Sequence, residues 1–221
     1  MITQLGTCPF SCYARFPKLT EQYFINTRWP SVEMIVPLVG DDRYFLMLYR
    51  ELYYRHIYAH NTTGLSVDDM RNSFANYCSL FAELLDASKP LLLELPCQWL
   101  WDIIDEFIYQ FQKFTIFRSR SKHKPDEEAL LKENHKVWSI HSVLNILHKL
   151  VEKSNINEQL QYYATSSDPD LVAGEFGSCP VYKMLGFFSL IGLCRLHVLL
   201  GDYFKALRFL KHIDLSRIVS F

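Results

Sequence analysis

The sequence lacks the short motifs that mark the common catalytic sites. It contains no phosphate loop of the form G-x-x-x-x-G-K, no G-x-S-x-G turn and no H-E-x-x-H zinc pair. None of its 6 cysteines forms a C-x-x-C pair, which argues against a zinc ribbon or a thioredoxin-type redox site. We therefore expect a protein without enzymatic activity and without a cofactor.

A strong charge of either sign and a secretory leader are missing as well. The formal net charge is -1, which gives no general reason to bind nucleic acid or an anionic membrane. The first residues, MITQLGTCPFSCYARF, lack the basic start and the apolar run of a signal peptide. We expect the reducing environment of the cytoplasm, with the cysteines as free thiols.

Residues that interrupt helices are scarce. With 8 glycines and 9 prolines in 221 residues, long stretches of the chain are free to form helix. Hydrophobic residues make up 49% of the chain and aromatic residues 15%, enough for the core of one large domain or two small ones. No strand pattern competes with the helical spacing, so the predicted fold class is all-α.

The strongest helical pattern runs from Leu95 to Phe114 and reads LPCQWLWDIIDEFIYQFQKF. Apolar residues recur there at steps of three and four, which makes a wide apolar stripe on a helix. Acidic residues fall on the other face near the helix start, where the helix dipole favours negative charge. The residues predicted to form the central core are Leu100, Ile104, Phe107 and Phe111.

Weaker signals predict further helices and turns along the chain. Asp41 or Asp42 can cap a helix that ends near His60, and Ser66 can cap the next one. Proline and glycine predict turns around residues 32–36 and a long turn over residues 165–177. The other predicted helices cover residues 19–24, 66–87, 138–151 and 155–163, and one more is predicted to begin near Glu127.

A helix pair is predicted at the C-terminal end. Tyr182–Leu200 forms the first helix, Gly201-Asp202 a tight turn and Tyr203–His212 the second helix. The first helix contains the most apolar run of the chain, but Arg195 and His197 interrupt it, so we expect a buried helix rather than a membrane span. The pattern G-D-Y-x-x-A-L resembles the middle of a tetratricopeptide-type repeat, although the sequence holds no second copy.

Two groups of polar residues are candidates for metal binding. Asp102, Asp105 and Glu106 share one side of the central helix, where they could hold a divalent metal. Di-metal helix bundles also use Glu-x-x-His pairs, which this sequence lacks. His141 and His148 are seven residues apart, whereas a ligand pair on a helix sits more naturally four apart. We therefore interpret both groups as polar helix positions, the acidic one as a solvated face or a docking strip.

Aromatic and basic residues between positions 49 and 58 are candidates for partner contacts. Stacking on nucleic-acid bases is one role open to them. Their helical spacing favours a division between the core and a protein interface, where aromatic residues and Arg are the usual anchors. The residues predicted to contact a partner protein are Tyr53, Tyr54, Arg55, Asp102, Asp105, Glu106 and Tyr203.

A short basic run after the central helix is a candidate for RNA contact. Its side chains could lie on RNA phosphates, and binding would then depend on salt concentration. Three carboxylates, Asp126, Glu127 and Glu128, follow directly and cancel much of the positive field. A solvated linker is the alternative interpretation of the run, which consists of Arg118, Arg120, Lys122 and Lys124.

Several long blocks of the sequence resemble the family of subunit L of eukaryotic translation initiation factor three. They include ELPCQWLWDIIDEFIYQFQ and YKMLGFFSLIGLCRLHVLLGDYFKALRFLKHIDL, and they follow the family order from Leu19 to Leu215. The resemblance implies a non-enzymatic, all-helical scaffold subunit of a multisubunit complex that binds the small ribosomal subunit and promotes recruitment of messenger RNA. The implied partners are the other subunits of that complex.

The resemblance also implies a C-terminal PCI module, in which stacked helices precede a winged helix. Most of that module has no counterpart before Phe221, so we expect a truncated form, and an isoform unable to assemble is one alternative. A scaffold of another PCI-containing complex, of the proteasome-lid or signalosome type, is a second alternative. The predicted segments are a loose leader over residues 1–17, an N-terminal helical region over 18–153, and the start of a PCI-associated helical-repeat region over 154–221.

Overall fold

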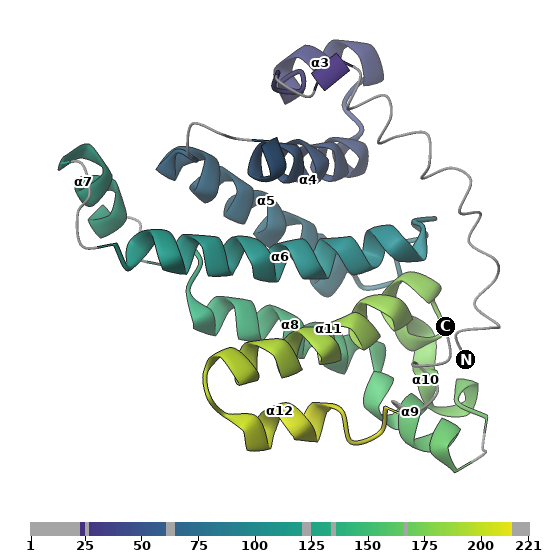
Figure 1. Cartoon of the computed structure of the whole chain (residues 1–221). Helices are drawn as coiled ribbons and strands as arrows, with labels where there is room; N and C mark the ends of the chain where they lie inside the picture. Colours follow the sequence, from purple (N-terminus) through teal and green to yellow (C-terminus); the bar gives the residue numbers. More distant parts are fainter. Residues whose placement is uncertain are drawn as a thin grey trace. The chain divides into compact units, whose positions relative to one another are not determined.

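The computed structural model describes residues 23–24, 27–60, 65–120, 125–133, 136–165 and 168–213. Throughout these residues the regular secondary structure is α-helix, and none of them forms a strand (Figure 1). The predicted all-α class is therefore confirmed. The predicted leader over residues 1–17 lies outside the described residues.

The chain divides into two compact units that do not follow the sequence order. Unit 1 holds residues 1–80 and 120–137, and unit 2 holds residues 81–119 and 138–221. Helix α5 (Val67–Asp86) begins in unit 1 and ends in unit 2. The predicted segment boundary between residues 153 and 154 stays a prediction.

Unit 1 contains α3 (Val32–Val39), α4 (Arg43–His60), most of α5 and α7 (Pro125–Glu133). The predicted caps are present, because Asp42 Oδ1 accepts from the backbone N–H of Phe45 at 3.0 Å. Ser66 Oγ likewise accepts from the backbone N–H of Asp69 at 3.0 Å. Each bond satisfies a donor that the first turn of a helix leaves unpaired.

The turn predicted around residues 32–36 is wrong, because these residues belong to helix α3. Pro37 lies inside this helix, where it removes a single backbone donor. The helix is only 8 residues long and packs against α4 with Val32 buried. The loss of one backbone donor therefore does not prevent this short helix from forming.

Unit 2 is built around α6 (Cys97–Arg118), which is the helix predicted from the sequence. The four predicted core residues are buried, with Phe107 fully inaccessible to solvent. The Phe107 ring lies 5.0 Å from Phe81 and 5.4 Å from Trp138 between ring centroids. Such edge-on and tilted aromatic contacts add to the apolar burial that already holds α6 in the core.

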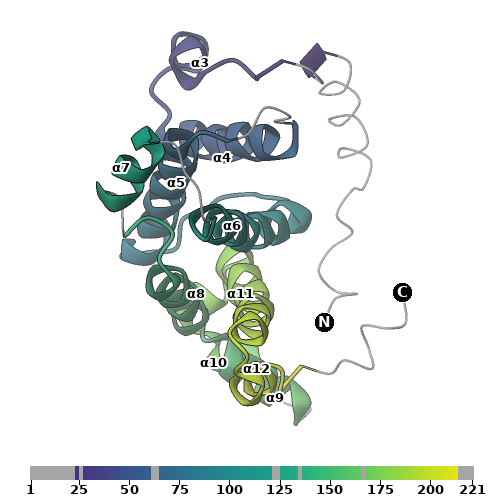
Figure 2. The ribbon, with the colours of Figure 1, turned by 60° about the vertical axis from the view of Figure 1, so that its left-hand side comes forward.

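The second central helix of unit 2 is α11 (Pro180–Leu199), which packs against both α6 and α8 (Ile140–Ser154). In Figures 1 and 2, α8 and α11 lie side by side along one side of α6. By length and composition α11 could cross a membrane, but 67% of its apolar window is buried inside the protein. The prediction of a buried helix is thus confirmed.

The tight turn after α11 is also confirmed. Gly201 has φ +75°, which favours glycine, and Asp202 Oδ1 accepts from the backbone N–H of Lys205 at 3.2 Å. Helix α12 (Tyr203–Phe209) is shorter than predicted because residues 210–212 form turns. The result is a helical hairpin in which α12 packs back on α11.

The long turn predicted over residues 165–177 is wrong in its second half. Helix α9 (Ile156–Ala164) is followed by α10 (Asp170–Gly177), with a kink at Gly174 where φ is +65°. Asn155 holds these helices together, since its Nδ2 donates to the backbone oxygen of Val172 at 2.7 Å. The glycines that suggested a turn instead permit a kink and a close approach to the end of α8.

Replacing Phe107 with Ala should lower the free energy of unfolding by about 3–5 kcal/mol, because it leaves a large cavity in the core of unit 2. Urea or thermal unfolding measures this loss. The matched control on the same helix is Ile116→Ala, since that side chain is 59% exposed and should change stability by less than about 0.5 kcal/mol. Equal stabilities of the two variants would refute the core assignment.

Candidate partner-binding surfaces

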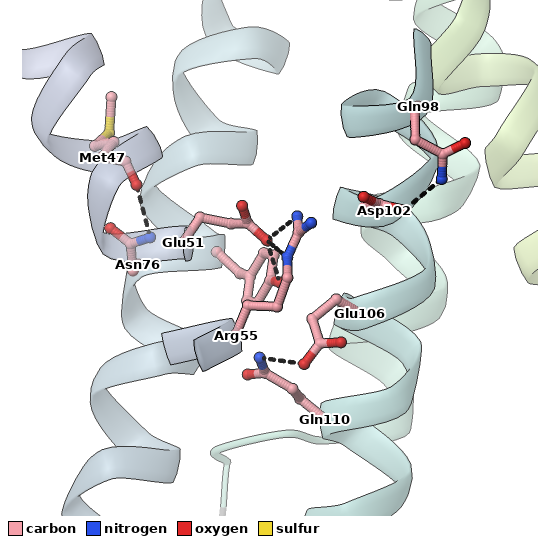
Figure 3. Close-up of polar contacts among 9 residues, drawn as sticks. Met47, Glu51, Arg55, Asn76, Gln98, Asp102, Glu106 and Gln110 are labelled. Carbon is pink, nitrogen blue, oxygen red and sulfur yellow. Dashed lines mark hydrogen bonds and ion pairs between the residues drawn. The ribbon is translucent and has the colours of Figure 1, made fainter. Parts of the chain in front are cut away.

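The predicted interface residues on α4 are all half-buried. The rings of Tyr53 and Tyr54 contact each other edge to face, with centroids 5.3 Å apart. Arg55 Nη2 and Nε both donate to Glu51 Oε1, at 2.6 and 3.1 Å (Figure 3). Burial raises the pKa of the Tyr54 hydroxyl, with smaller contributions from nearby acidic groups.

Glu51 explains why Arg55 is held in this position. Its carboxylate is fully buried, and Tyr77 OH also donates to the same oxygen at 3.2 Å. A buried carboxylate needs such partners, because an unpaired charge in the core would be strongly destabilising. Arg55 therefore has a structural role in unit 1, and its contact with a partner protein stays a prediction.

Two acidic residues of α6 accept hydrogen bonds from glutamine side chains of the same helix (Figure 3). Asp102 accepts from Gln98 Nε2 at 2.7 Å, and Glu106 accepts from Gln110 Nε2 at 3.1 Å. These bonds join residues one turn apart on the same helix. All three carboxylates are half-buried, so the acidic strip remains accessible for a partner.

Asp105 differs from the other two because its bond ties α6 to α11. Arg195 Nη1 donates to Asp105 Oδ1 at 2.6 Å, and Arg195 Nη2 donates to Gln112 Oε1 at 2.8 Å. Both charged side chains are partly exposed, so water screens much of the attraction between them. Arg195, the charged residue that interrupts the apolar run of α11, thus links α11 to α6.

The described residues contain no group of three or more His, Cys, Asp and Glu side chains that could hold a metal ion. His148, one of the two histidines considered for metal binding, lies beside the ring of Phe209 with centroids 5.6 Å apart. His141 is exposed on α8.

The structure describes only half of the basic run. Arg118 is exposed, and its guanidinium lies 5.8 Å from the centroid of the Phe114 ring. Arg120 is exposed directly after α6. Lys122 and Lys124 lie outside the described residues, so RNA contact through this run stays a prediction.

An exposed apolar surface lies on the hairpin of α11 and α12. Large apolar side chains are exposed at the end of α11 and along the outer side of α12. We call this surface the α12 face; it consists of Leu199 (54% exposed), Leu200 (54%), Tyr203 (64%), Phe204 (75%) and Leu207 (68%). Of these, only Tyr203 was predicted as a contact residue, although apolar residues outside the inner stripe are visible in the sequence.

The inner side of α12 packs against a buried histidine of α11, His197. Ala206 is buried, and the Phe209 ring stacks on His197 with centroids 5.4 Å apart. His197 Nδ1 is 3.7 Å from Asp202 Oδ2, and Lys205 Nζ is 3.2 Å from the same oxygen. Burial lowers the pKa of His197, an effect that Asp202 opposes and Lys205 and His148 reinforce.

The predicted interface residues therefore come from three helices in two units. Tyr53, Tyr54 and Arg55 follow one another on α4 in unit 1. In unit 2 the acidic strip lies on α6 and Tyr203 on α12. The sequence reasoning missed Arg195, the partner of Asp105, because two residues 90 apart in sequence give no local signal.

The described residues define an all-helical protein whose accessible features are aromatic, apolar and charged surface strips. A family model described as RNA polymerase I-associated factor PAF67 matches residues 69–221. The chain belongs to this family.

The chain is also similar to known proteins over a longer stretch than the family model matches. Subunit L of eukaryotic translation initiation factor 3 from Homo sapiens is 56% identical over 201 residues, which is 90% of this chain. The same subunit from Nematostella vectensis is 57% identical over 203 residues. The alignments cover 36% of the human protein and 38% of the Nematostella protein, so the chain spans little more than a third of these relatives.

Acid should destabilise the protein through His197. The folded state holds this ring with a lowered pKa, whereas the unfolded chain protonates it near the ordinary value of 6.5. Stability is therefore present above that value and is lost as the pH falls through the folded pKa. Urea unfolding at about pH 7.5 and about pH 5.5 measures the loss, to which His56, also buried with a lowered pKa, should contribute.

The variant His197→Gln should lose less stability between the two pH values than the wild type. The control His141→Gln removes an exposed histidine and should leave the pH dependence unchanged. If His197→Gln and the wild type show the same pH dependence, the buried ring of His197 is not the group that titrates.

Proposed function

We propose that the chain is a non-catalytic scaffold subunit of the translation initiation factor 3 type, acting in the cytoplasm through contacts with other proteins. The observation that carries this proposal is the 56% identity over 90% of the chain to subunit L from vertebrates. Its partners are then the other subunits of the complex and, through the complex, the small ribosomal subunit. Its contribution is to support recruitment of messenger RNA.

The surface chemistry supports a role in assembly. The α12 face and the tyrosine pair on α4 present aromatic and large apolar groups, which are the usual anchors of protein interfaces. The acidic strip on α6 adds charge that selects and orients a partner. We propose Tyr53, Tyr54, Arg55, Asp102, Asp105, Glu106 and Tyr203 as contact residues, and Arg118, Arg120, Lys122 and Lys124 as weaker candidates for RNA contact.

The helix pair of α11 and α12 supports a PCI-type arrangement. In helical arrays each pair buries one face against its neighbour and offers the other face to the next pair. The buried inner side and the exposed outer side of α12 match that pattern. The similarity to initiation-factor subunits gives no support to the alternative of a proteasome-lid or signalosome scaffold.

Sedimentation in a sucrose gradient tests the proposed function. The tagged chain is expressed in cells, and the gradient fractions are probed for the chain, for other initiation-factor subunits and for a small-subunit ribosomal protein. We expect the chain to migrate with the preinitiation fractions, because its accessible strips bind other subunits. A tagged full-length subunit L is the positive control.

The variant Phe107→Asp serves as the negative control, since a charge in the core should unfold unit 2 and release the chain from the complex. Migration of the wild-type chain as a free small protein, while full-length subunit L reaches the heavy fractions, would show that residues 1–221 do not act as a scaffold subunit.

A further inference from the structure

Side chains of helix α4 hold a short stretch of unit 1 in place. The stretch consists of the described residues that precede Ser31, which are 23–24 and 27–30, and we call it the strap. The Trp29 ring stacks on the His56 ring with centroids 5.4 Å apart and lies 6.0 Å from the Tyr49 ring. Tyr49 OH also donates to the backbone oxygen of Pro30 at 2.7 Å. Residues 27–30 form no regular secondary structure, so these side chains fix their position.

His56 is the central residue of this attachment. It is only 7% exposed, and its Nε2–H donates to the backbone oxygen of Phe24 at 3.0 Å. The bond fixes the neutral tautomer in which Nδ1 carries no proton. Nδ1 is buried and has no hydrogen-bond partner among the described residues. A second proton on this ring would therefore lack an acceptor, and its positive charge would lie out of water.

The groups around His56 do not compensate for that charge. Burial lowers the pKa of His56; the bond to Phe24 opposes this shift, and His60, whose ring lies 4.4 Å away between centroids, adds to it. The Trp29 face attracts a cation but offers no acceptor for a second N–H, so a charged ring gains more by turning into water. The charged side chains on the strap, α3, α4 and α5 are engaged with other groups: Arg28 with Asp69, Arg55 with Glu51, Arg71 with Asp68, and Glu33 with Ser31.

We propose that His56 is a pH-sensitive switch, whose neutral ring holds the strap on α4 and whose protonation at Nδ1 releases the strap. The ring is neutral above the ordinary value of 6.5, and its hold on the strap is lost as the pH falls through the lowered value of the folded state. This inference goes beyond the proposed function, because it concerns the response of one part of unit 1 to acid.

Release of the strap would change the surface that α4 offers to a partner. Trp29 and Pro30 contact Tyr49 in the closed form. The proposed contact residue Tyr53 lies one turn further along α4. Acid would therefore uncover an aromatic ring directly beside a proposed contact residue.

Fluorine NMR of the full chain tests the switch. 5-Fluorotryptophan is placed at position 29 in one sample, where it reports the strap, and at position 138 in another, where the native ring is fully buried in unit 2. Between about pH 7.5 and about pH 5 we expect the open fraction seen at position 29 to rise at least about fivefold. The resonance at position 138 should keep its position over the range in which the strap opens.

Two results of this titration would overturn the proposal. An unchanged resonance at position 29 would show that the strap stays closed in acid. A change at positions 29 and 138 with the same midpoint would show that the fold is lost as a whole, without a separate release of the strap.

Variants assign the response to His56. His56→Gln cannot be protonated but keeps an N–H group for the Phe24 oxygen, so its strap should stay closed at both pH values. The matched control His141→Gln removes an exposed histidine of α8 and should open as the wild type does. The same pH response in His56→Gln as in the wild type would refute the role of His56.

The titration of the His56 ring in the wild type decides the case in which the strap of His56→Gln is open throughout. Carbon-13 NMR of the imidazole follows its protonation, which should occur over the same pH interval as the change at position 29. Protonation of His56 with the strap still closed would contradict the switch.

Tyr49→Phe adds a test that leaves His56 in place. The variant removes the hydrogen bond to the Pro30 oxygen, so less of the attachment remains to be overcome and the strap should open at a higher pH. Opening at a lower or unchanged pH would contradict the proposed attachment of the strap to α4.

Discussion

The close approach of α11 to α6 and α8 is the constraint on which unit 2 depends. Gly192 faces α6, where an added Cβ would lie 2.8 Å from Ile108 Cδ1, and Gly186 faces the end of α8, where it would overlap Ser154 Oγ. A side chain at Gly186 would push α11 away from α8, and one at Gly192 would require the end of the Ile108 side chain to move. Two glycines in the most apolar helix of the chain therefore allow its neighbours to share one dry core.

The polar residues of α11 act at the borders of that core. Arg195 reaches Asp105 and Gln112 on α6, so the positive charge that interrupts the apolar run fixes α11 against α6. His197 lies in the last turn of α11 and stacks on Phe209, which positions α12. The same helix therefore buries its middle in the core and uses its C-terminal part to orient the hairpin.

Sequence reasoning succeeded where a periodic pattern and a local cap agree, and failed where long-range packing decides. The stripe of α6 and the caps at Asp42, Ser66 and Asp202 were predictable because both signals lie within a few residues. Helices α3 and α10 were missed because proline or glycine inside them suggests a turn. Helix α10 nonetheless packs against α8, α9 and α11, and α3 tolerates the loss of the one donor that Pro37 removes. Most of the α12 face was missed because exposure depends on which side of a short helix is buried, and that side is set by contacts with α11 and α8.

A comparison of α8 with α12 shows that two helices of one unit differ in the side chains that they expose to water. The exposed positions of α8 are His141, Asn145, Lys149 and Glu152, all polar, as expected for a helix that faces water on one side. Helix α12 instead exposes Phe204 and Leu207, although it lies in the same unit and packs on the same neighbour. Apolar surface left in water promotes nonspecific association, so a helix face that contacts only water is usually polar. The contrast between two helices of one unit is therefore the physical reason to interpret the α12 face as a surface on which a further helix packs, as in a helical array.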